Sequence, residues 1–104
     1  AFGAEVFIFF PGGYGTLDEF FEIITLIQTK KVAGVPLICF GSEYWNKFKS
    51  FMESELLSRH AINLNDLKLF TITDSLDEII EIIKKVPVVD SIPLPEIEET
   101  YQSF

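Results

Sequence analysis

The stretch FIFFPGGYGTLDEFFEII, residues 7–24, decides the fold of this chain. An apolar run rich in Val, Ile and Phe, residues 5–10, ends at a Pro-Gly-Gly triplet, and a helical pattern follows it. A strand of this composition is typical of parallel sheets, in which both faces of a strand are buried. We expect the helix to begin at Thr16 or Leu17 and to end near Lys31, where two lysines suit the C-terminal dipole.

The alternation of strand and helix continues to residue 86. It predicts a parallel sheet with right-handed crossovers, which is an α/β doubly wound fold with helices flanking the sheet. We expect one domain over residues 1–86 and an extended C-terminal tail over residues 87–104, which carries several prolines and acids. The other expected elements are strands at 35–40 and 67–73, a helix from Ser42 or Glu43 to about His60, and a helix that is capped by residues 74–78 and stopped by Pro87.

The sequence contains material for only three strands. A parallel sheet this narrow leaves an apolar edge exposed. The chain also begins with Ala1 and enters its first strand almost at once. We therefore expect the chain to be the C-terminal part of a larger fold, with further strands supplied by an upstream segment or by a partner chain.

The charge of the chain excludes several classes of partner. Its 104 residues carry a formal net charge of −8, whereas binding to nucleic acid or to an anionic membrane requires a basic surface. No apolar run approaches the roughly 18 residues of a membrane span, and no signal peptide is visible, so we expect a cytoplasmic protein. The single cysteine, Cys39, lies in an apolar run and is expected to be buried rather than catalytic.

The first helix is apolar around most of its circumference. At about 100° per residue, its polar side chains fall in one narrow stripe, formed by Asp18, Glu22, Thr25 and Thr29. Packing on one sheet needs an apolar face of only about 100°. The helix between Leu17 and Ile27 is therefore expected to be covered on a second side. A homodimer interface is the favoured explanation, and burial under an upstream segment is the alternative.

The glycine loop, residues 11–16, connects the first strand to the first helix and is suited to binding an anion. The free N–H groups of a helix start point toward one spot, and the helix dipole favours negative charge there. Glycine permits positive φ and close approach of a ligand to the backbone, and Thr16 adds a hydroxyl. The loop lacks the Gly-Lys-Ser/Thr of a P-loop and the third glycine of the dinucleotide fingerprint, where Asp18 stands. A tight turn without a ligand is the alternative.

Glu19 has two interpretations. The segment from Thr16 to Glu19 fits the capping box Ser/Thr-x-x-Glu, in which the glutamate bonds back to the Thr16 amide. The same pattern runs from Ser75 to Glu78, where we expect a cap alone. Glu19 differs because the glycine loop sets an anion site beside its carboxylate. Cleavage of a sugar phosphate at C1 needs an anion site for the phosphate and a carboxylate beside it.

The segment PGGYGTLDE, residues 11–19, resembles the Pro-Gly-Gly-x-Gly-Thr-x-x-Glu signature of the LONELY GUY family. Its members are cytokinin riboside 5′-monophosphate phosphoribohydrolases, and many relatives carry the label "possible lysine decarboxylase". The resemblance implies a Rossmann-like fold, of which this chain is the C-terminal portion, and a homodimer. It also implies hydrolysis of the N-glycosidic bond of a nucleoside 5′-monophosphate, either AMP or a cytokinin riboside 5′-monophosphate. This reaction needs no metal and no cofactor.

The resemblance also assigns roles to residues of the signature. Glu19 would be the catalytic carboxylate, because an oxocarbenium-like state forms as the C1–N bond breaks and a carboxylate stabilises it. The phosphate would be held by Gly12, Gly13, Gly15 and Thr16, and the substrate pocket would be lined by Tyr14, Leu17, Asp18 and Thr25. A nucleotide or cofactor carrier on the same fold and a purely structural subunit are the other hypotheses.

A partner for the glutamate is expected outside this chain. The family pairs it with an arginine of an Arg-Lys pair, at a position that falls before Ala1, whereas the only arginine here, Arg59, lies at the end of another helix. We expect the upstream segment to supply that arginine. The decarboxylase label finds no support, because pyridoxal chemistry needs a pocket lysine and Lys30 and Lys31 lie at the far end of the first helix.

Overall fold

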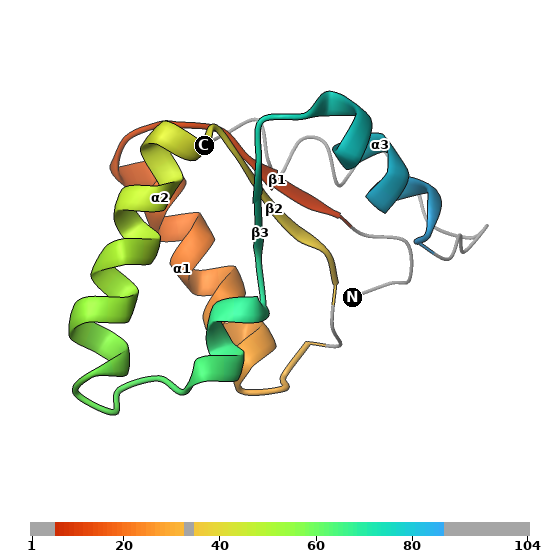
Figure 1. Cartoon of the computed structure of the whole chain (residues 1–104). Coiled ribbons are helices and arrows are strands. Elements are labelled where there is room, and N and C mark those ends of the chain that lie inside the picture. The colour runs from red at the N-terminus through yellow and green to blue at the C-terminus, as the bar shows by residue number, and fades with distance from the viewer. Residues whose placement is uncertain (1–5, 33–34, 87–104) are drawn as a thin grey trace.

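The computed structural model describes residues 6–32 and 35–86, along which strands and helices alternate (Figure 1). The elements are β1 (Phe7–Phe9), α1 (Tyr14–Gln28), β2 (Leu37–Phe40), α2 (Ser42–Phe51), the π-helical turn η1 (Met52–Leu57), the 3₁₀ helix η2 (Leu64–Lys68), β3 (Thr71–Thr73) and α3 (Leu76–Lys84). The predicted tail over residues 87–104 lies outside the described residues. None of the helices in the described ranges has both the length and the apolar character to cross a membrane.

The three strands form one parallel sheet in the order β1-β2-β3. In its register Ile38 of β2 pairs with Ile8 on one side and with Thr71 on the other. Helices α1 and α2 lie on one face of the sheet and α3 on the other (Figure 1). This is the predicted α/β, Rossmann-like arrangement. The β1–α1 loop and the start of α2 lie at the same end of the sheet (Figure 1), its carboxyl edge, where ligands bind in open α/β folds.

Phe20 of α1 is at the centre of the core. Its side chain is fully buried. The centroid of its ring lies 5.6 Å from that of Phe9, 5.0 Å from that of Trp45 and 5.7 Å from that of Phe70. The contacts with Phe9 and Phe70 are edge-to-face, a geometry that stabilises a core beyond the apolar area it buries. These contacts fix α1 relative to the sheet and therefore fix the start of α1 relative to the loop before it.

Cys39 is buried in the central strand, as predicted. It stands between Phe9 of β1 and Ile72 of β3 in the sheet register. Burial raises the pKa of its thiol to about 12. The thiolate that a nucleophile requires is therefore not formed at neutral pH, and Cys39 contributes packing.

The start of α1 corrects one prediction. The helix begins at Tyr14 rather than at Thr16 or Leu17, and it ends at Gln28 rather than near Lys31. Gly13 is the N-cap residue, and no side chain caps the helix. Thr16 and Glu19 both lie inside the helix, so the capping box predicted for them is wrong.

The segment before β3 corrects a second prediction. The third strand covers only Thr71–Thr73, because the residues before it form the helix η2. Asp66 N donates to Asn63 Oδ1 at 3.1 Å, and Asn63 N donates to Asp66 Oδ2 at 2.9 Å. This reciprocal capping box satisfies the local backbone, so it competes successfully with a sheet ladder. Leu67 still reaches the core, but from a helix.

The N-terminus of α3 carries the predicted serine cap. Ser75 Oγ accepts a hydrogen bond from Glu78 N at 3.1 Å. The second half of the predicted box is replaced, since Ser75 N donates to Thr73 Oγ1 at 3.0 Å. The cap is therefore shared between the helix and the end of β3.

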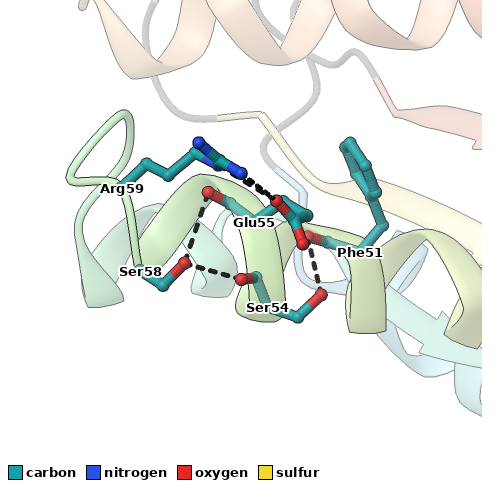
Figure 2. A network of polar contacts seen from close by, with 5 residues as sticks. All are labelled: Phe51, Ser54, Glu55, Ser58 and Arg59. Atoms are coloured by element: carbon teal, nitrogen blue, oxygen red, sulfur yellow. Dashed lines mark hydrogen bonds and ion pairs between the residues drawn. The ribbon is translucent and has the colours of Figure 1, made fainter.

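The helix after β2 ends in the π-helical turn η1 rather than running regularly to His60. Figure 2 shows the side-chain bonds of this turn. Ser58 Oγ donates to Ser54 O at 2.6 Å, and the Nε and Nη2 atoms of Arg59 both lie 3.0 Å from Glu55 Oε1. His60 then adopts a left-handed φ of 62°, a conformation that commonly ends a helix. The side chain of Arg59 is thus paired with Glu55. The C-terminal end of the segment formed by α2 and η1 lies far from the β1–α1 loop (Figure 1).

Candidate functional site

A cavity of about 290 Å³ extends along β1, from Phe7 at its start to the loop after its carboxyl end. Its size is near the lower end of the range for small-molecule sites. It is lined by β1, by the loop after it and by two side chains of α1, namely Phe7, Ile8, Phe9, Phe10, Pro11, Gly12, Gly13, Thr16 and Glu19. The structure therefore brings together Gly12, Gly13, Thr16 and Glu19 of the predicted site.

The start of α1 supplies backbone donors beside this cavity. The first amide that continues the helix is Leu17 N, which donates to Gly13 O at 3.1 Å. Among the described residues, the amides of Gly13, Tyr14 and Gly15 have no hydrogen-bond acceptor. A helix start leaves such donors unpaired, and with the helix dipole they attract an anion.

The glycines of the loop differ in the space that surrounds their Cα atoms. A Cβ atom on Gly12 would overlap the hydroxyl of Thr16, so a side chain there cannot fit without displacing Thr16. A Cβ atom on Gly13 or Gly15 would meet no atom within 4 Å. These two positions face open space, which a ligand can enter. Positive φ, one expected use of the loop glycines, is found instead at Gly41, whose φ is 103°.

Glu19 lies on the inward face of α1, and only 7% of its surface is exposed. No residue of the described ranges forms a hydrogen bond or an ion pair with its carboxylate. Burial raises the pKa of this carboxyl above its ordinary value, and the negative charges of Glu22 and Asp18 raise it further. The residue as a whole is buried, but its carboxylate oxygens reach the cavity and are not sealed in the core. Groups whose pKa is perturbed in this way concentrate at functional sites. Glu19 is therefore the candidate reactive group of the cavity.

The other predicted site residues lie outside this cavity. Gly15, Tyr14, Asp18 and Thr25 are exposed, and Leu17 is half-buried against the core. Thr25 Oγ1 donates to Phe21 O at 2.6 Å, within its own helix. Their contribution to a substrate pocket stays a prediction. In the part of the chain that the structure describes, no group of three His, Cys, Asp or Glu side chains is placed to hold a metal ion.

Tyr44 is a neighbour of the glycine loop that the sequence pattern did not indicate. Its hydroxyl donates to Gly12 O at 2.7 Å across 32 positions of sequence. The one available signal is its place in the first turn of α2. The carboxyl ends of adjacent parallel strands lie side by side, so the segment after β2 must lie beside the segment after β1.

Comparison with known families agrees with the motif. The model of the family described as "Possible lysine decarboxylase" matches residues 2–83 of the chain. The matched range includes the glycine loop, Glu19 and all three strands. No curated protein matched the chain.

Proposed function

The chain belongs to the family described as "possible lysine decarboxylase", and from this premise we propose that it is a nucleoside 5′-monophosphate phosphoribohydrolase. The proposed substrate is AMP or a cytokinin riboside 5′-monophosphate, and the products are the free base and ribose 5-phosphate. The proposal follows the LONELY GUY signature at residues 11–19, and it goes beyond the family description.

One observation carries the proposal: the unpaired carboxylate of a buried residue shares a cavity with a glycine loop. Glu19 lines the same cavity as Gly12, Gly13 and Thr16. The loop offers donors for the 5′-phosphate, and a ribose bound by that phosphate would bring C1′ toward the carboxylate. A carrier would have no need for the electrostatic cost of Glu19.

The reaction requires a water molecule and a stabilised positive charge. Water adds to C1′ as the bond between C1′ and the base nitrogen breaks, and a proton of that water ends on the departing base. We assign two tasks to Glu19, stabilising the oxocarbenium-like state and orienting or deprotonating the water. Its raised pKa makes the carboxylate a stronger base at neutral pH. The unpaired amides of Gly13, Tyr14 and Gly15 and the Thr16 hydroxyl would hold the phosphate.

Lysine decarboxylation is not the activity that we propose. Pyridoxal chemistry requires a lysine in the pocket, and no lysine lines the cavity within the described residues. Lys30 and Lys31 follow the C-terminal end of α1 and are exposed. They are separated from the glycine loop by the whole length of the helix.

An arginine partner for the reaction is proposed to come from an upstream segment of the same polypeptide. Arg59 is a poor candidate for this role, because it is paired with Glu55 on η1. An upstream arginine would compensate the charge of Glu19 and contact the phosphate or the leaving base. Assays should therefore use the chain together with any natural sequence that precedes Ala1.

The test is release of free base from AMP. Protein is incubated with AMP or with adenosine, and adenine and ribose 5-phosphate are quantified by chromatography. We expect adenine from AMP and at least a hundredfold less from adenosine, since the phosphate supplies the binding energy that positions C1′. Binding of AMP without release would instead support the carrier. Absence of both binding and release would contradict any nucleotide role.

Gly13→Ala provides the matched loop variant. Its methyl group meets no protein atom within 4 Å, so we expect a change in stability of about 1 kcal/mol or less. The same methyl group would occupy the space of the ligand and weaken AMP binding by at least tenfold. Gly12→Ala is the contrasting control, because its methyl group strikes Thr16 and should lower stability. Unchanged AMP affinity in folded Gly13→Ala would remove the phosphate site from this loop.

A further inference from the structure

The Tyr44 hydroxyl, which bonds to the glycine loop, is held in place by the packing of its own ring. The hydroxyl donates to Gly12 O at 2.7 Å. The ring packs against Trp45 at 4.9 Å and against Phe48 at 5.3 Å, between ring centroids. Trp45 is itself almost completely buried. The donor therefore sits on the core and not on a mobile side chain.

The direction of this bond determines the direction of the next amide. The chain has no cis peptide in its described residues, and in a trans peptide the C=O and the following N–H point in opposite directions. Gly12 O points to Tyr44, and Tyr44 is not among the residues that line the cavity, whereas Gly12 and Gly13 are. The Gly13 N–H is thereby directed away from Tyr44, and it has no acceptor within the described residues.

We propose that Tyr44 is a positioning residue for phosphate, holding the Gly12–Gly13 peptide so that the Gly13 amide faces the ligand. This inference rests on the proposed function. Glycine has little steric resistance to rotation of its backbone, so a Gly-Gly peptide without an anchor is free to turn over. Its carbonyl oxygen would then replace the amide and repel the phosphate.

The start of α2 is rigid enough to serve as the anchor. Ser42 N donates to Asp74 Oδ1 at 2.7 Å, and Ser42 Oγ donates to Asp74 Oδ2 at 2.5 Å. Gly41 N donates to Thr73 O at 3.0 Å. A Cβ atom on Gly41 would lie 3.1 Å from Pro11 Cγ, so the two connections pack closely. The end of β3 thus holds α2, and α2 holds the loop.

The experiment compares Tyr44→Phe with Ser58→Ala. Tyr44→Phe keeps the ring and removes only the hydroxyl. Ser58→Ala removes another hydroxyl-to-carbonyl bond, Ser58 Oγ to Ser54 O at 2.6 Å, at the opposite end of the same helical segment (Figures 1 and 2). Affinities for AMP and for adenosine are measured by NMR titration of folded protein.

We expect Tyr44→Phe to lower AMP affinity by about tenfold, the worth of one charge-assisted hydrogen bond. Adenosine affinity should not change, because adenosine lacks the phosphate. A general loss of structure would weaken both ligands together, so the AMP-to-adenosine ratio isolates the positioning role. Ser58→Ala should keep the wild-type ratio.

Different outcomes separate the positioning role of Tyr44 from the proposed function. If wild-type protein binds AMP more tightly than adenosine and Tyr44→Phe keeps that ratio, the positioning role is overturned and the proposed function stands. If wild-type protein does not prefer AMP, both are overturned. Should Tyr44→Phe not fold, Ser42→Ala replaces it, because it removes the Ser42 Oγ bond to Asp74 that holds the start of α2. A lowered AMP-to-adenosine ratio in that variant supports the inference, and an unchanged ratio overturns it.

Discussion

Glu19 is the residue whose environment departs most from what its chemistry prefers. A carboxylate is normally exposed or paired, yet Glu19 is buried and has no partner within the described residues. Glu22 and Asp18 add negative charge to its surroundings. Stability is commonly sacrificed in this way at reactive sites. The cost should be measurable in the absence of any substrate.

Glu19→Gln should stabilise the protein at neutral pH. The pKa of Glu19 is raised in the folded state above its ordinary value of 4.5, so the folded protein holds this proton more tightly than the unfolded chain does. The resulting contribution to stability is complete below the ordinary pKa and is lost as pH rises through the folded-state pKa. Glutamine stays neutral and avoids that loss. Thermal melts should therefore show Glu19→Gln above wild type at pH 7, with the difference shrinking toward pH 4.

The control for this measurement is Glu53→Gln on η1, because Glu22 and Asp18 act on the pKa of Glu19 and would not be neutral. Glu53 is exposed, so its substitution should change stability by about 0.5 kcal/mol or less. A Glu19→Gln protein that is less stable than wild type at pH 7 would contradict the unpaired carboxylate. That result would mean that the carboxylate has a stabilising partner.

At the scale of one element, α1 has more apolar surface than this chain covers. Its inward side carries Phe20 and Ile27, which are buried. Phe21 is 40% exposed, although it belongs to the same helix. A second cavity of about 150 Å³ lies between α1 and the η1 and η2 segments, and it is lined in part by Phe21, Ile24 and Met52. We propose that the helix between Leu17 and Ile27 forms a homodimer interface, as the apolar arc predicts.

Phe21→Glu is the substitution that tests this interface. Phe21 is 40% exposed and Phe20 is fully buried, so Phe21→Glu should disturb the core far less than Phe20→Glu would. The Phe21 ring lies 5.0 Å from that of Phe20, so circular dichroism must first show that the variant is folded. We expect wild-type dimers and Phe21→Glu monomers in sedimentation velocity at tens of micromolar, since an unpaired charge in an apolar interface is costly. Leu76→Glu on α3 is the control, because α3 lies on the other face of the sheet (Figure 1). A monomeric wild type at these concentrations would refute the interface.

For the whole molecule, features that depend on neighbouring residues were predicted from the sequence better than features that depend on long-range contacts. The composition of the strands and their alternation with helices were enough to predict the parallel α/β fold, because these patterns depend only on neighbouring residues. The serine cap of α3 is local in the same sense. The helix η2 was missed because the Asn63–Asp66 capping box outweighs an apolar run that resembles a strand.

The candidate site was predicted only in part for the same reason. The glycine loop and Glu19 were found from their order in the chain, but the burial of Glu19 depends on how α1 packs on the sheet. The bond from Tyr44 to Gly12 joins residues from two different strand–helix units. The periodicity of the sequence does not predict such a contact, because it forms only when the sheet brings the two units together.

The proposed reaction requires the Glu19 carboxylate, beside the phosphate loop, for cleavage of the glycosidic bond, and turnover of AMP by Glu19→Gln measures this requirement. Free adenine is measured with wild type, Glu19→Gln and the control Glu53→Gln, each shown to be folded. Loss of the charge at Glu19 should lower turnover by roughly 10² to 10⁴-fold, the usual worth of an acid–base group, while Glu53→Gln stays near wild type. Turnover by Glu19→Gln within a few-fold of wild type would contradict this requirement.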